Sequence, residues 1–443
     1  MDGDRKTLSR REFLRESAAA AAAFSMGVAA PARAAEETKP ADLEPILYGF
    51  VGTGNQGRRL LSRAVRVPGT RVVALCDIYP PNLEEGMKIA KDVRTYQDYR
   101  EMLEKERDLD AVLVATPLHW HAPITIDALR AGKHVFCEKT LARTVEECKE
   151  IVRASRETGK FVQVGHQRRY NPLYEHALKL IKKDGVLGRI THIRALWHRN
   201  GSWRRAVPEE MPPGTNLALW GYEDLEHLIN WRLYRKSSGG LMTELASHQL
   251  DVVNWFLEAT PLSVMGLGGI DYWEDGREVY DNVSVLYEYP NGVKVVYTSI
   301  TTNAYDDYYE QFMGDEGTLL LTKETQGLLF REVRAEKLAW ERFAHKDKSR
   351  GKEGIVLDAQ ATPDKKKRRG RGAGKQVGGK EAQKDPFYPY YLELEDFFAC
   401  VREGRKPFCD AEAAMRSAVT VLMANEAIKR DTKIEFTEDL FAV

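Results

Sequence analysis

The chain has 443 residues, and its 66 lysines and arginines balance its 66 aspartates and glutamates, so the formal net charge is zero. This balance argues against a nucleic-acid-binding protein, which needs a basic surface to meet the phosphates. A hydrophobic content of 43% supports ordinary folded domains, and the length suits two of them. The five cysteines lack metal or disulfide spacing, and we expect them to be packing residues. They are Cys76, Cys137, Cys148, Cys400 and Cys409.

Residues 1–34 have the three parts of a twin-arginine export signal. Arg10 and Arg11 precede a weakly apolar run over 18–30, and Ala32-Arg33-Ala34 provides an A-x-A cleavage site. The run is too short and too rich in alanine for a membrane-spanning helix, which needs about 20 strongly apolar residues. We therefore expect the twin-arginine machinery to export the folded protein to the periplasm, without a stable membrane anchor.

Residues 45–167 alternate short apolar runs with helical segments. Such alternation predicts a parallel, doubly wound sheet whose strands are covered on both faces. The expected strands are 46–51, 71–76, 111–115, 134–137 and 161–164, with helices over 56–65, 123–131 and 145–158.

A glycine-rich turn follows the first expected strand and opens a helix. It consists of Gly52, Thr53, Gly54, Asn55, Gln56 and Gly57. Glycines let the backbone approach a pyrophosphate closely, and the helix N-terminus favours its charge. Asp77 ends the next strand, where its carboxylate can accept hydrogen bonds from ribose hydroxyls and repels a 2′-phosphate. The sequence therefore predicts bound NAD, with NADP disfavoured.

Two more polar clusters follow expected strands, at the sheet edge where ligands bind. Thr116, Pro117 and His121 belong to the first, and Glu138 and Lys139 to the second. A lysine whose pKa falls through partial burial can exchange protons near neutrality. The alternative is that Lys139 only forms an ion pair with Glu138.

Residues 168–436 follow a different pattern, with a helix over 173–183, a strand over 191–198 and an irregular segment over 201–235. A long helix over 241–257 then precedes a series of strands that predicts a large, mostly antiparallel open-faced sheet. These strands are 262–268, 283–289, 293–300, 308–313, 318–322 and 327–333. One helix covers only one sheet face, so we expect the other face to meet water or another subunit of a homo-oligomer.

Two further helices are expected over 390–402 and 411–429. Before them, residues 344–385 are charged and rich in glycine, and we expect a disordered basic loop there. Such a run is usually just solvated, although an anionic partner is an alternative.

Within the long expected helix, Glu244 and His248 are four residues apart and should share a face and a hydrogen bond. A carboxylate next to an imidazole fixes its tautomer and raises its basicity. Such a pair is more often structural than catalytic, and the role of Asp251, one turn further on, stays open.

Four motifs in this order resemble the Gfo/Idh/MocA oxidoreductase family. They read GTGNQG, TPLHWHA, GKHVFCEKT and GGLMTELASHQLD, and the resemblance covers 46 to about 436 except the basic loop. The family implies an α/β fold, with an N-terminal Rossmann domain and a C-terminal α/β domain. The open sheet of the second domain supports the substrate site and commonly the oligomer interface.

The resemblance also implies roles for individual residues. Lys139 matches the family lysine that contacts the reacting hydroxyl, His248 matches the proton-relay histidine, and Glu244 the acidic residue before it. Thr140 replaces the usual proline, which implies a less rigid turn at Lys139. Glu244 replaces the commoner aspartate, and His166 replaces an apolar residue near the nicotinamide.

These observations predict an exported, metal-free NAD-dependent oxidoreductase that acts on a secondary hydroxyl of a sugar, glycoside or cyclitol, with tightly bound, recycled cofactor. Lys139 and His248 would remove the hydroxyl proton, while His121 and Gln167 frame the nicotinamide. The other expected substrate contacts are His166, Arg168, Trp203, Tyr222 and Trp231, although the aromatic residues could equally be core packing. The alternatives are a redox-neutral, NAD-dependent glycoside hydrolase and a non-catalytic sugar or nucleotide sensor.

Overall fold

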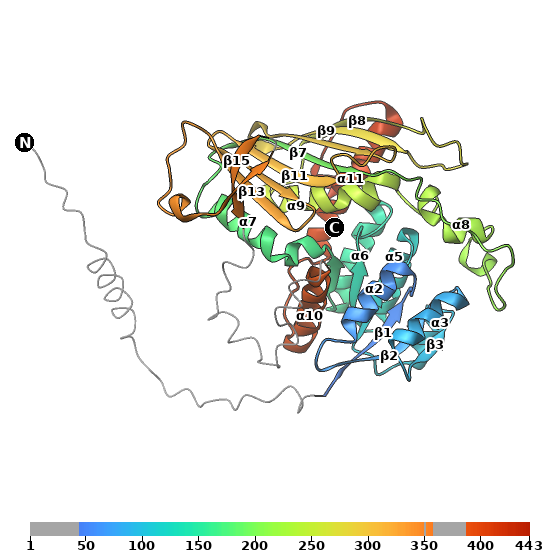
Figure 1. Cartoon of the computed structure of the whole chain (residues 1–443). Helices are drawn as coiled ribbons and strands as arrows, with labels where there is room; N and C mark the ends of the chain where they lie inside the picture. The colour runs from blue at the N-terminus through green and yellow to red at the C-terminus, as the bar shows by residue number, and fades with distance from the viewer. Residues whose placement is uncertain (1–43, 350, 358–386) are drawn as a thin grey trace, which may run out of the picture.

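The computed structural model of the chain describes residues 44–349, 351–357 and 387–443 (Figure 1). The expected export signal lies outside these residues, as does most of the expected basic loop. Among the described residues, no helix combines the length and apolar character that crossing a membrane requires.

The first domain contains a six-stranded parallel sheet with the order β3-β2-β1-β4-β5-β6. All four residues of the central strand β4 are buried, as expected for a sheet covered on both faces. This confirms the predicted doubly wound sheet, and adds the short β3 that the sequence did not suggest. The strands are β1 (Ile46–Val51), β2 (Thr70–Cys76), β3 (Arg94–Tyr96), β4 (Ala111–Val114), β5 (His134–Glu138) and β6 (Val162–Gly165).

Helices connect these strands, and their ends follow local chemistry. Helix α6 begins in a capping box, in which the Thr144 side chain accepts from the Glu147 amide and Glu147 in turn accepts from the Thr144 amide. It ends at Gly159, whose φ of 66° is a left-handed conformation that favours glycine. The helices are α2 (Asn55–Ala64), α3 (Pro80–Ile89), α4 (Tyr99–Lys105), α5 (His121–Arg130) and α6 (Val145–Thr158).

The second domain contains a ten-stranded sheet with the order β14-β15-β13-β12-β11-β7-β10-β9-β8-β16. Each neighbouring pair is antiparallel except β7 and β10, which confirms the mostly antiparallel prediction. The strands are β7 (Ile190–His198), β8 (Ser263–Gly269), β9 (Asn282–Glu288), β10 (Lys294–Ile300), β11 (Tyr308–Gly314), β12 (Gly317–Thr322), β13 (Gln326–Arg331), β14 (Lys346–Ser349), β15 (Lys352–Leu357) and β16 (Ile434–Glu435).

Strands β14 and β15 correct the expected loop over 344–385. They form a hairpin that extends the sheet at β13, and Ile355 and Leu357 are buried in the core of this domain. Two apolar side chains on alternate positions are enough to hold this edge, although the surrounding sequence is highly charged. The remainder of the expected loop, 358–385, lies outside the described residues.

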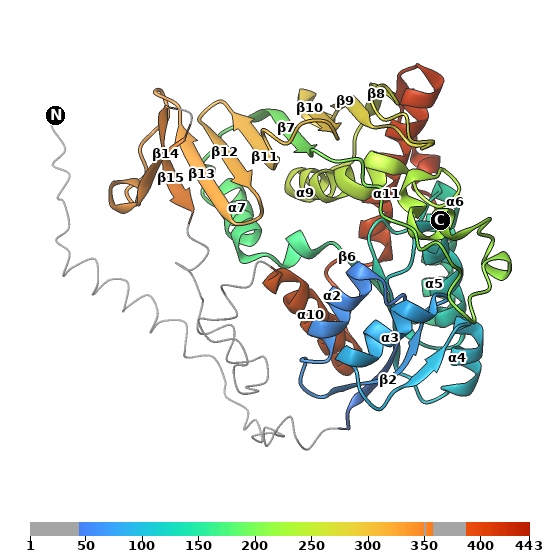
Figure 2. The same ribbon diagram turned by 45° about the vertical axis from the view of Figure 1, so that its right-hand side comes forward.

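Helices α7 (Pro172–Lys182), α9 (Ser247–Leu257) and α11 (Ala411–Arg430) pack on one face of the large sheet (Figure 2). Burial alternates along β9, as one covered and one open face require. The open face carries exposed apolar side chains on three neighbouring strands, namely Met265, Leu267, Leu286 and Val296.

The last two helices bind the two domains together. Helix α10 (Tyr388–Glu403) buries Phe397 and Phe398 in a core shared with β1 and α2, although it follows the second sheet in the chain. Helix α11 packs on α6 of the first domain and on α9 and β8 of the second. All five cysteines are free and buried, which confirms them as packing residues.

Candidate active site

A cavity of about 540 Å³ lies at the carboxyl ends of β1, β2, β4 and β5 and is closed by residues of the second domain. This volume is within the range that holds small ligands and cofactors. Most residues expected at the site line it, which brings together segments far apart in the chain. They are Gly52, Gly54, Asn55, Gln56, Asp77, Thr116, Pro117, His121, Glu138, Lys139, Trp203, Tyr222, Trp231, Glu244 and His248.

The glycine-rich turn has the geometry that a dinucleotide needs. Gly52 has a φ of 92°, and a Cβ atom there would lie 2.7 Å from the Ala115 carbonyl. Gly57 does not line the cavity, but a Cβ atom there would lie 1.8 Å from the Gly52 oxygen, so only glycine lets α2 pack on the turn. No side chain caps the N-terminus of α2, which leaves its first amides available to an anion. The turn therefore fits the pyrophosphate of NAD.

Asp77 holds this turn in place as well as lining the cavity. Its Oδ2 accepts hydrogen bonds from the amide of Thr53 at 2.7 Å and from Asn82 Nδ2 at 3.2 Å, while its Oδ1 accepts from the Tyr79 amide at 2.9 Å. Burial raises the pKa of Asp77, and these hydrogen bonds oppose that rise. The residue expected to bind ribose thus also orders the pyrophosphate turn.

Lys139 lies at the centre of the cavity wall, between the two domains. Its Nζ donates to the Glu244 carbonyl oxygen at 2.9 Å and lies 3.5 Å from that of Thr243. Burial lowers the pKa of Lys139, and the nearby carboxylates of Glu244 and Glu138 oppose the change. Glu138 accepts from the backbone amide of Lys139 and from Gln56 Nε2, so the alternative of a simple Lys139–Glu138 ion pair does not describe this site.

The backbone around Glu244 differs from the α-helix expected over 241–257. Residues Met242–Ala246 form the π-helix η6, and α9 begins only at Ser247. A π-helix has more residues per turn than an α-helix, so residues four apart no longer face the same way. The expected Glu244–His248 hydrogen bond is therefore wrong. Glu244 Oε2 instead accepts from Arg232 Nε at 2.9 Å.

His248 is buried beside the indole of Trp197, with ring centroids 5.5 Å apart. Its Nδ1 has no hydrogen-bond partner among the described residues. Burial and the nearby charge of Lys139 lower the pKa of His248 well below its usual value. The imidazole is therefore neutral at pH 7.

Hydrogen bonds hold the turn after Lys139, where the resemblance implied less rigidity. The Thr140 hydroxyl donates to the Thr243 carbonyl oxygen at 2.8 Å. His121 Nδ1 lies 2.8 Å from the backbone carbonyl oxygen of Thr140. The other nitrogen of His121 lies 3.0 Å from the Thr116 oxygen. Burial lowers the pKa of His121. His121 thus positions the cavity wall by joining two strand ends.

Gln167, Arg168 and His166 do not line the cavity. Gln167 Nε2 lies 3.4 Å from Glu324, and the Arg168 guanidinium pairs with Glu310 and Glu324, although its Nη2 has no hydrogen-bond partner among the described residues. These carboxylates neutralise the Arg168 guanidinium inside the second domain. The structure therefore corrects the expected direct contacts of Gln167 with cofactor and of Arg168 with substrate.

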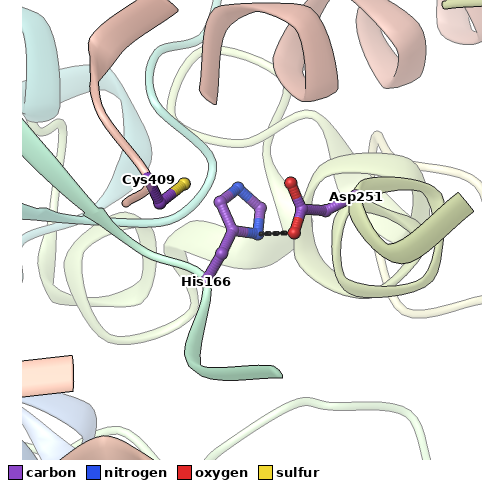
Figure 3. A group of neighbouring side chains, drawn as sticks. All are labelled: His166, Asp251 and Cys409. Carbon is purple, nitrogen blue, oxygen red and sulfur yellow. Dashed lines mark ion pairs between the residues drawn. The ribbon is translucent and has the colours of Figure 1, made fainter. Parts of the chain in front are cut away.

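His166 belongs to a buried cluster with Asp251 and Cys409, in which the three potential ligand atoms lie within 4.8 Å of one another (Figure 3). His166 Nδ1 is 3.6 Å from Asp251 Oδ2. However, Asp251 Oδ1 already accepts from Arg169 Nη2 at 2.8 Å and from Ser417 Oγ at 2.7 Å. A guanidinium on the same carboxylate opposes a divalent cation, so we interpret the cluster as a packing contact between β6, α9 and α11. Substrate contact by His166 is not supported.

The cavity also contains residues that the sequence analysis did not select. Trp197 lies near the end of β7, and Tyr390 comes from α10. Three arginines come from the irregular segment and its flanks, namely Arg199, Arg205 and Arg232. Arginine and tryptophan alternate closely along 197–232, which was the available signal. The position of Tyr390 depends on how α10 returns to the first domain, and local sequence carries no such information.

Two family models match the chain. Residues 46–166 match "Oxidoreductase family, NAD-binding Rossmann fold", and residues 179–436 match "Oxidoreductase family, C-terminal alpha/beta domain". Together these matches cover most of the chain.

Individual relatives differ in what their names describe. An inositol 2-dehydrogenase from Salmonella typhimurium is 33% identical over 220 residues, which span 46% of this chain and 62% of that protein. An alpha-N-acetylgalactosaminidase from Shewanella oneidensis is 31% identical over 183 residues, or 37% of this chain and 39% of that protein. The chain thus spans less than two thirds of the length of either relative.

Among solved structures, a levoglucosan dehydrogenase in complex with NADH and levoglucosan superposes with a TM-score of 0.68. The match covers 88% of this chain and 99% of that one at 19% sequence identity, which establishes similarity of fold.

Proposed function

Because the chain belongs to the Gfo/Idh/MocA oxidoreductase family, with its NAD-binding Rossmann domain and C-terminal α/β domain, we propose that it oxidises a secondary hydroxyl of a sugar, glycoside or cyclitol. One observation carries the proposal: the partly buried side chain of Lys139 and the imidazole of His248 line the same cavity as the glycine-rich turn. A proton acceptor and a dinucleotide site are thereby placed together.

Different residues would bind the cofactor, accept the proton and contact the sugar. The amides of α2 and the side chain of Asp77 would hold NAD, which when bound supplies the hydride acceptor. Lys139 would take the hydroxyl proton, because burial favours its neutral form. His248 is neutral for the same reason and would relay the proton or orient the hydroxyl. Trp203 and Trp231 line the cavity and would pack on the apolar face of a sugar.

A redox-neutral glycoside hydrolase is the second candidate. The similarity to an alpha-N-acetylgalactosaminidase favours it, since that relative is named for hydrolysis. Both activities would begin with oxidation of a ring hydroxyl by the same residues. Incubation with aryl glycosides separates them: catalytic release of aglycone without added NAD indicates hydrolysis, whereas stoichiometric NADH or reduction of a second sugar indicates a dehydrogenase. A non-catalytic sensor has no need for the combination of Lys139 and His248.

We also propose that the protein is exported through the twin-arginine pathway and works in the periplasm with a tightly held, recycled cofactor. Free dinucleotide is scarce outside the cytoplasm, so a protein exported folded would carry its own. The exposed apolar side chains on β8, β9 and β10 support assembly into a homo-oligomer through the open sheet face.

Replacement of Lys139 by Met tests the proposed reaction. The variant should lose at least 100-fold in turnover, the order expected for one general base, while binding NAD like the unaltered protein. Lys91→Met is the control, because Lys91 is exposed and distant from the cavity. Near-normal turnover by Lys139→Met would refute the mechanism, and absence of any dinucleotide binding would refute the function.

A further inference from the structure

Three arginines line the cavity close to Lys139. Arg199 follows β7, Arg205 lies in the segment after it, and Arg232 belongs to the 3-10 helix η5 (Trp231–Leu233). Each guanidinium is permanently charged. Arg199 and Arg232 are partly buried, whereas Arg205 is exposed. The charges of the two partly buried guanidiniums favour a partner in the protein or in a ligand.

One of the three has a partner in the protein. Arg232 donates to Glu244 at 2.9 Å. Among the described residues, no carboxylate lies within ion-pair distance of Arg199 or Arg205, although the structure shows many such pairs elsewhere. Arg199 lies over the ring of Trp203, with 4.6 Å from its guanidinium carbon to the ring centroid. A stacked guanidinium keeps its edge donors free for a ligand.

Arg199 and Arg232 lie at the end of the cavity that holds Lys139 and His248. Arg232 binds Glu244, whose backbone oxygen accepts from Lys139 Nζ. Arg199 is two residues beyond Trp197, which packs on His248. The Arg199 amide still pairs with Ile300, so the chain stays extended and these two side chains point the same way.

The surroundings of Arg199 and Arg205 disfavour their charged forms. Burial lowers the pKa of both Arg199 and Arg205, and repulsion from Arg232 lowers it further. Around Lys139, the anionic side chains that line the cavity are Glu138, which bonds Gln56, and Glu244, which pairs with Arg232. A negatively charged group bound here would relieve the repulsion and make charge-assisted hydrogen bonds.

From this arrangement we infer that the substrate is an anionic carbohydrate, whose carboxylate, phosphate or sulfate group is held by Arg199 and Arg205 while Lys139 faces a ring hydroxyl. The inference rests on the proposed function and narrows its substrate class. A neutral sugar would leave the partly buried guanidinium of Arg199 unpaired, whereas the exposed guanidinium of Arg205 would keep contact with water.

The phosphates of NAD are the other possible occupant. Arg205 also experiences the charges of Arg58 and Arg59 on α2, so it lies toward the glycine-rich turn. The pyrophosphate, however, has its own donors in the uncapped amides of α2. Measurement of sugar binding and NAD binding on the same variants separates the two occupants.

The test measures binding and turnover with the purified, NAD-loaded full chain. The probes are glucuronate, galacturonate, glucose 6-phosphate and N-acetylglucosamine 6-sulfate, with glucose, galactose and myo-inositol as neutral counterparts. Calorimetry gives affinities and NADH absorbance gives kcat/KM. The variants are Arg199→Gln and Arg205→Gln, with Arg199→Lys to retain charge, and Arg130→Gln as an exposed control outside the cavity.

We expect at least one anionic probe to bind better than its neutral counterpart, and the affinity to fall as salt rises. Arg199→Gln and Arg205→Gln should each weaken binding of that probe by about tenfold to a hundredfold, with NAD affinity unchanged. The affinity of Arg199→Lys should lie between those of Arg199→Gln and the unaltered protein. The probe that binds identifies the anionic group of the substrate as a carboxylate, a phosphate or a sulfate. The inference is overturned if none of the anionic probes binds, whether or not neutral sugars do. It is also overturned if the arginine variants lose NAD affinity as much as they lose affinity for the anionic probe. Turnover of neutral sugars in either case would leave the proposed function standing.

Discussion

The ammonium group of Lys139 contacts backbone carbonyl oxygens and, among the described residues, has no carboxylate within ion-pair distance. Carbonyl dipoles orient the amine without stabilising its charged form as strongly as a carboxylate would. Together with burial, this arrangement favours the neutral amine, which is the form that accepts a proton. Under the proposed mechanism, the environment of Lys139 would therefore influence the pH dependence of turnover.

The pH dependence of turnover follows from this environment. The lowered pKa of Lys139 means that kcat/KM should rise with pH through a limb centred below the usual lysine value of about 10.4, because the deprotonated amine is the active form. A pH–rate profile measures the midpoint. In Lys139→Arg the limb should disappear from any residual activity, since arginine does not titrate in this range. A limb that persists unchanged would assign it to another group.

Glu393 provides a prediction about stability. It is fully buried on α10, and neither carboxylate oxygen has a hydrogen-bond partner among the described residues. Burial raises its pKa well above the usual value, with repulsion from Glu138 and Glu324 adding to the rise. The protonated form is therefore favoured in the folded state. Its contribution to stability is complete below the unfolded pKa of about 4.3 and declines as pH rises toward the folded value.

Glu393→Gln should remove this decline. Between pH 5 and pH 8, the free energy of unfolding of the unaltered protein should fall relative to the variant by about 1 kcal/mol or more, since one pKa unit corresponds to about 1.4 kcal/mol. Denaturant titrations at both pH values measure the difference, with the exposed Glu157→Gln as control. Parallel behaviour of the variant and the unaltered protein would show that Glu393 is ionised in the folded state.

At the residue scale, the sequence identified the parts of the site that lie directly after strands. Lys139, Asp77 and the glycines were predictable because strand ends of a parallel sheet meet at one edge. Arg168 was misassigned because its partners, Glu310 on β11 and Glu324 in the turn after β12, lie more than 140 residues away in the chain. Pairing over such a distance is determined by tertiary structure.

At the scale of elements, the π-helix η6 explains how the second domain contacts Lys139. Its wider turn frees carbonyl oxygens from the helical pattern. That of Thr243 accepts from the hydroxyls of Thr140 at 2.8 Å and Ser247 at 2.6 Å, and that of Glu244 accepts from Lys139. One irregular turn therefore holds both Lys139 and the residue after it.

Thr140→Val tests this role, because valine keeps the shape of threonine and removes its hydroxyl donor. The variant should lose about 1 kcal/mol of stability and show a lower kcat, with NAD affinity preserved. Chemical denaturation and steady-state kinetics measure these quantities. Thr158→Val removes a similar hydroxyl-to-carbonyl bond in α6, far from the site, and should leave kcat unchanged. Equal kcat in the two variants would contradict the proposed positioning.

Most helices and strands were predictable from periodicity, whereas η6 was not. The apolar pattern of residues 241–257 is compatible with an α-helix and does not distinguish it from the observed π-helix at Met242–Ala246. The incorrect prediction of a hydrogen bond between Glu244 and His248 follows directly from the assumption of a regular α-helix. The hairpin of β14 and β15 was missed for a related reason, since its charged sequence conceals the two apolar residues that bind it to the sheet.

At the scale of the whole molecule, α10 and α11 make the two domains interdependent. Phe397 on α10 is fully buried and lies against Phe136 and Phe161 of the first domain, with ring centroids 5.8 and 6.0 Å away. Seven of the eight tryptophans, in contrast, belong to the second domain. A substitution that destabilises one domain should therefore also shift the unfolding transition of the other domain.

Phe397→Ala should destabilise the protein by about 3–5 kcal/mol, the usual cost of removing a buried phenylalanine. We expect tryptophan fluorescence and far-ultraviolet circular dichroism to report one common transition, shifted equally for both probes. Phe343→Ala is the matched control, because Phe343 is largely exposed. Two separate transitions, with only the first-domain signal shifted, would show that the domains unfold independently.

The return of α10 also has a consequence for how the protein is made. Tyr390 is part of the cavity wall, yet it is translated more than 330 residues after the glycine-rich turn. While the ribosome is still synthesising the second sheet, the nucleotide pocket lacks one of its walls. The cavity can therefore close around a dinucleotide only after α10 has been synthesised, so its assembly belongs to a late stage of translation.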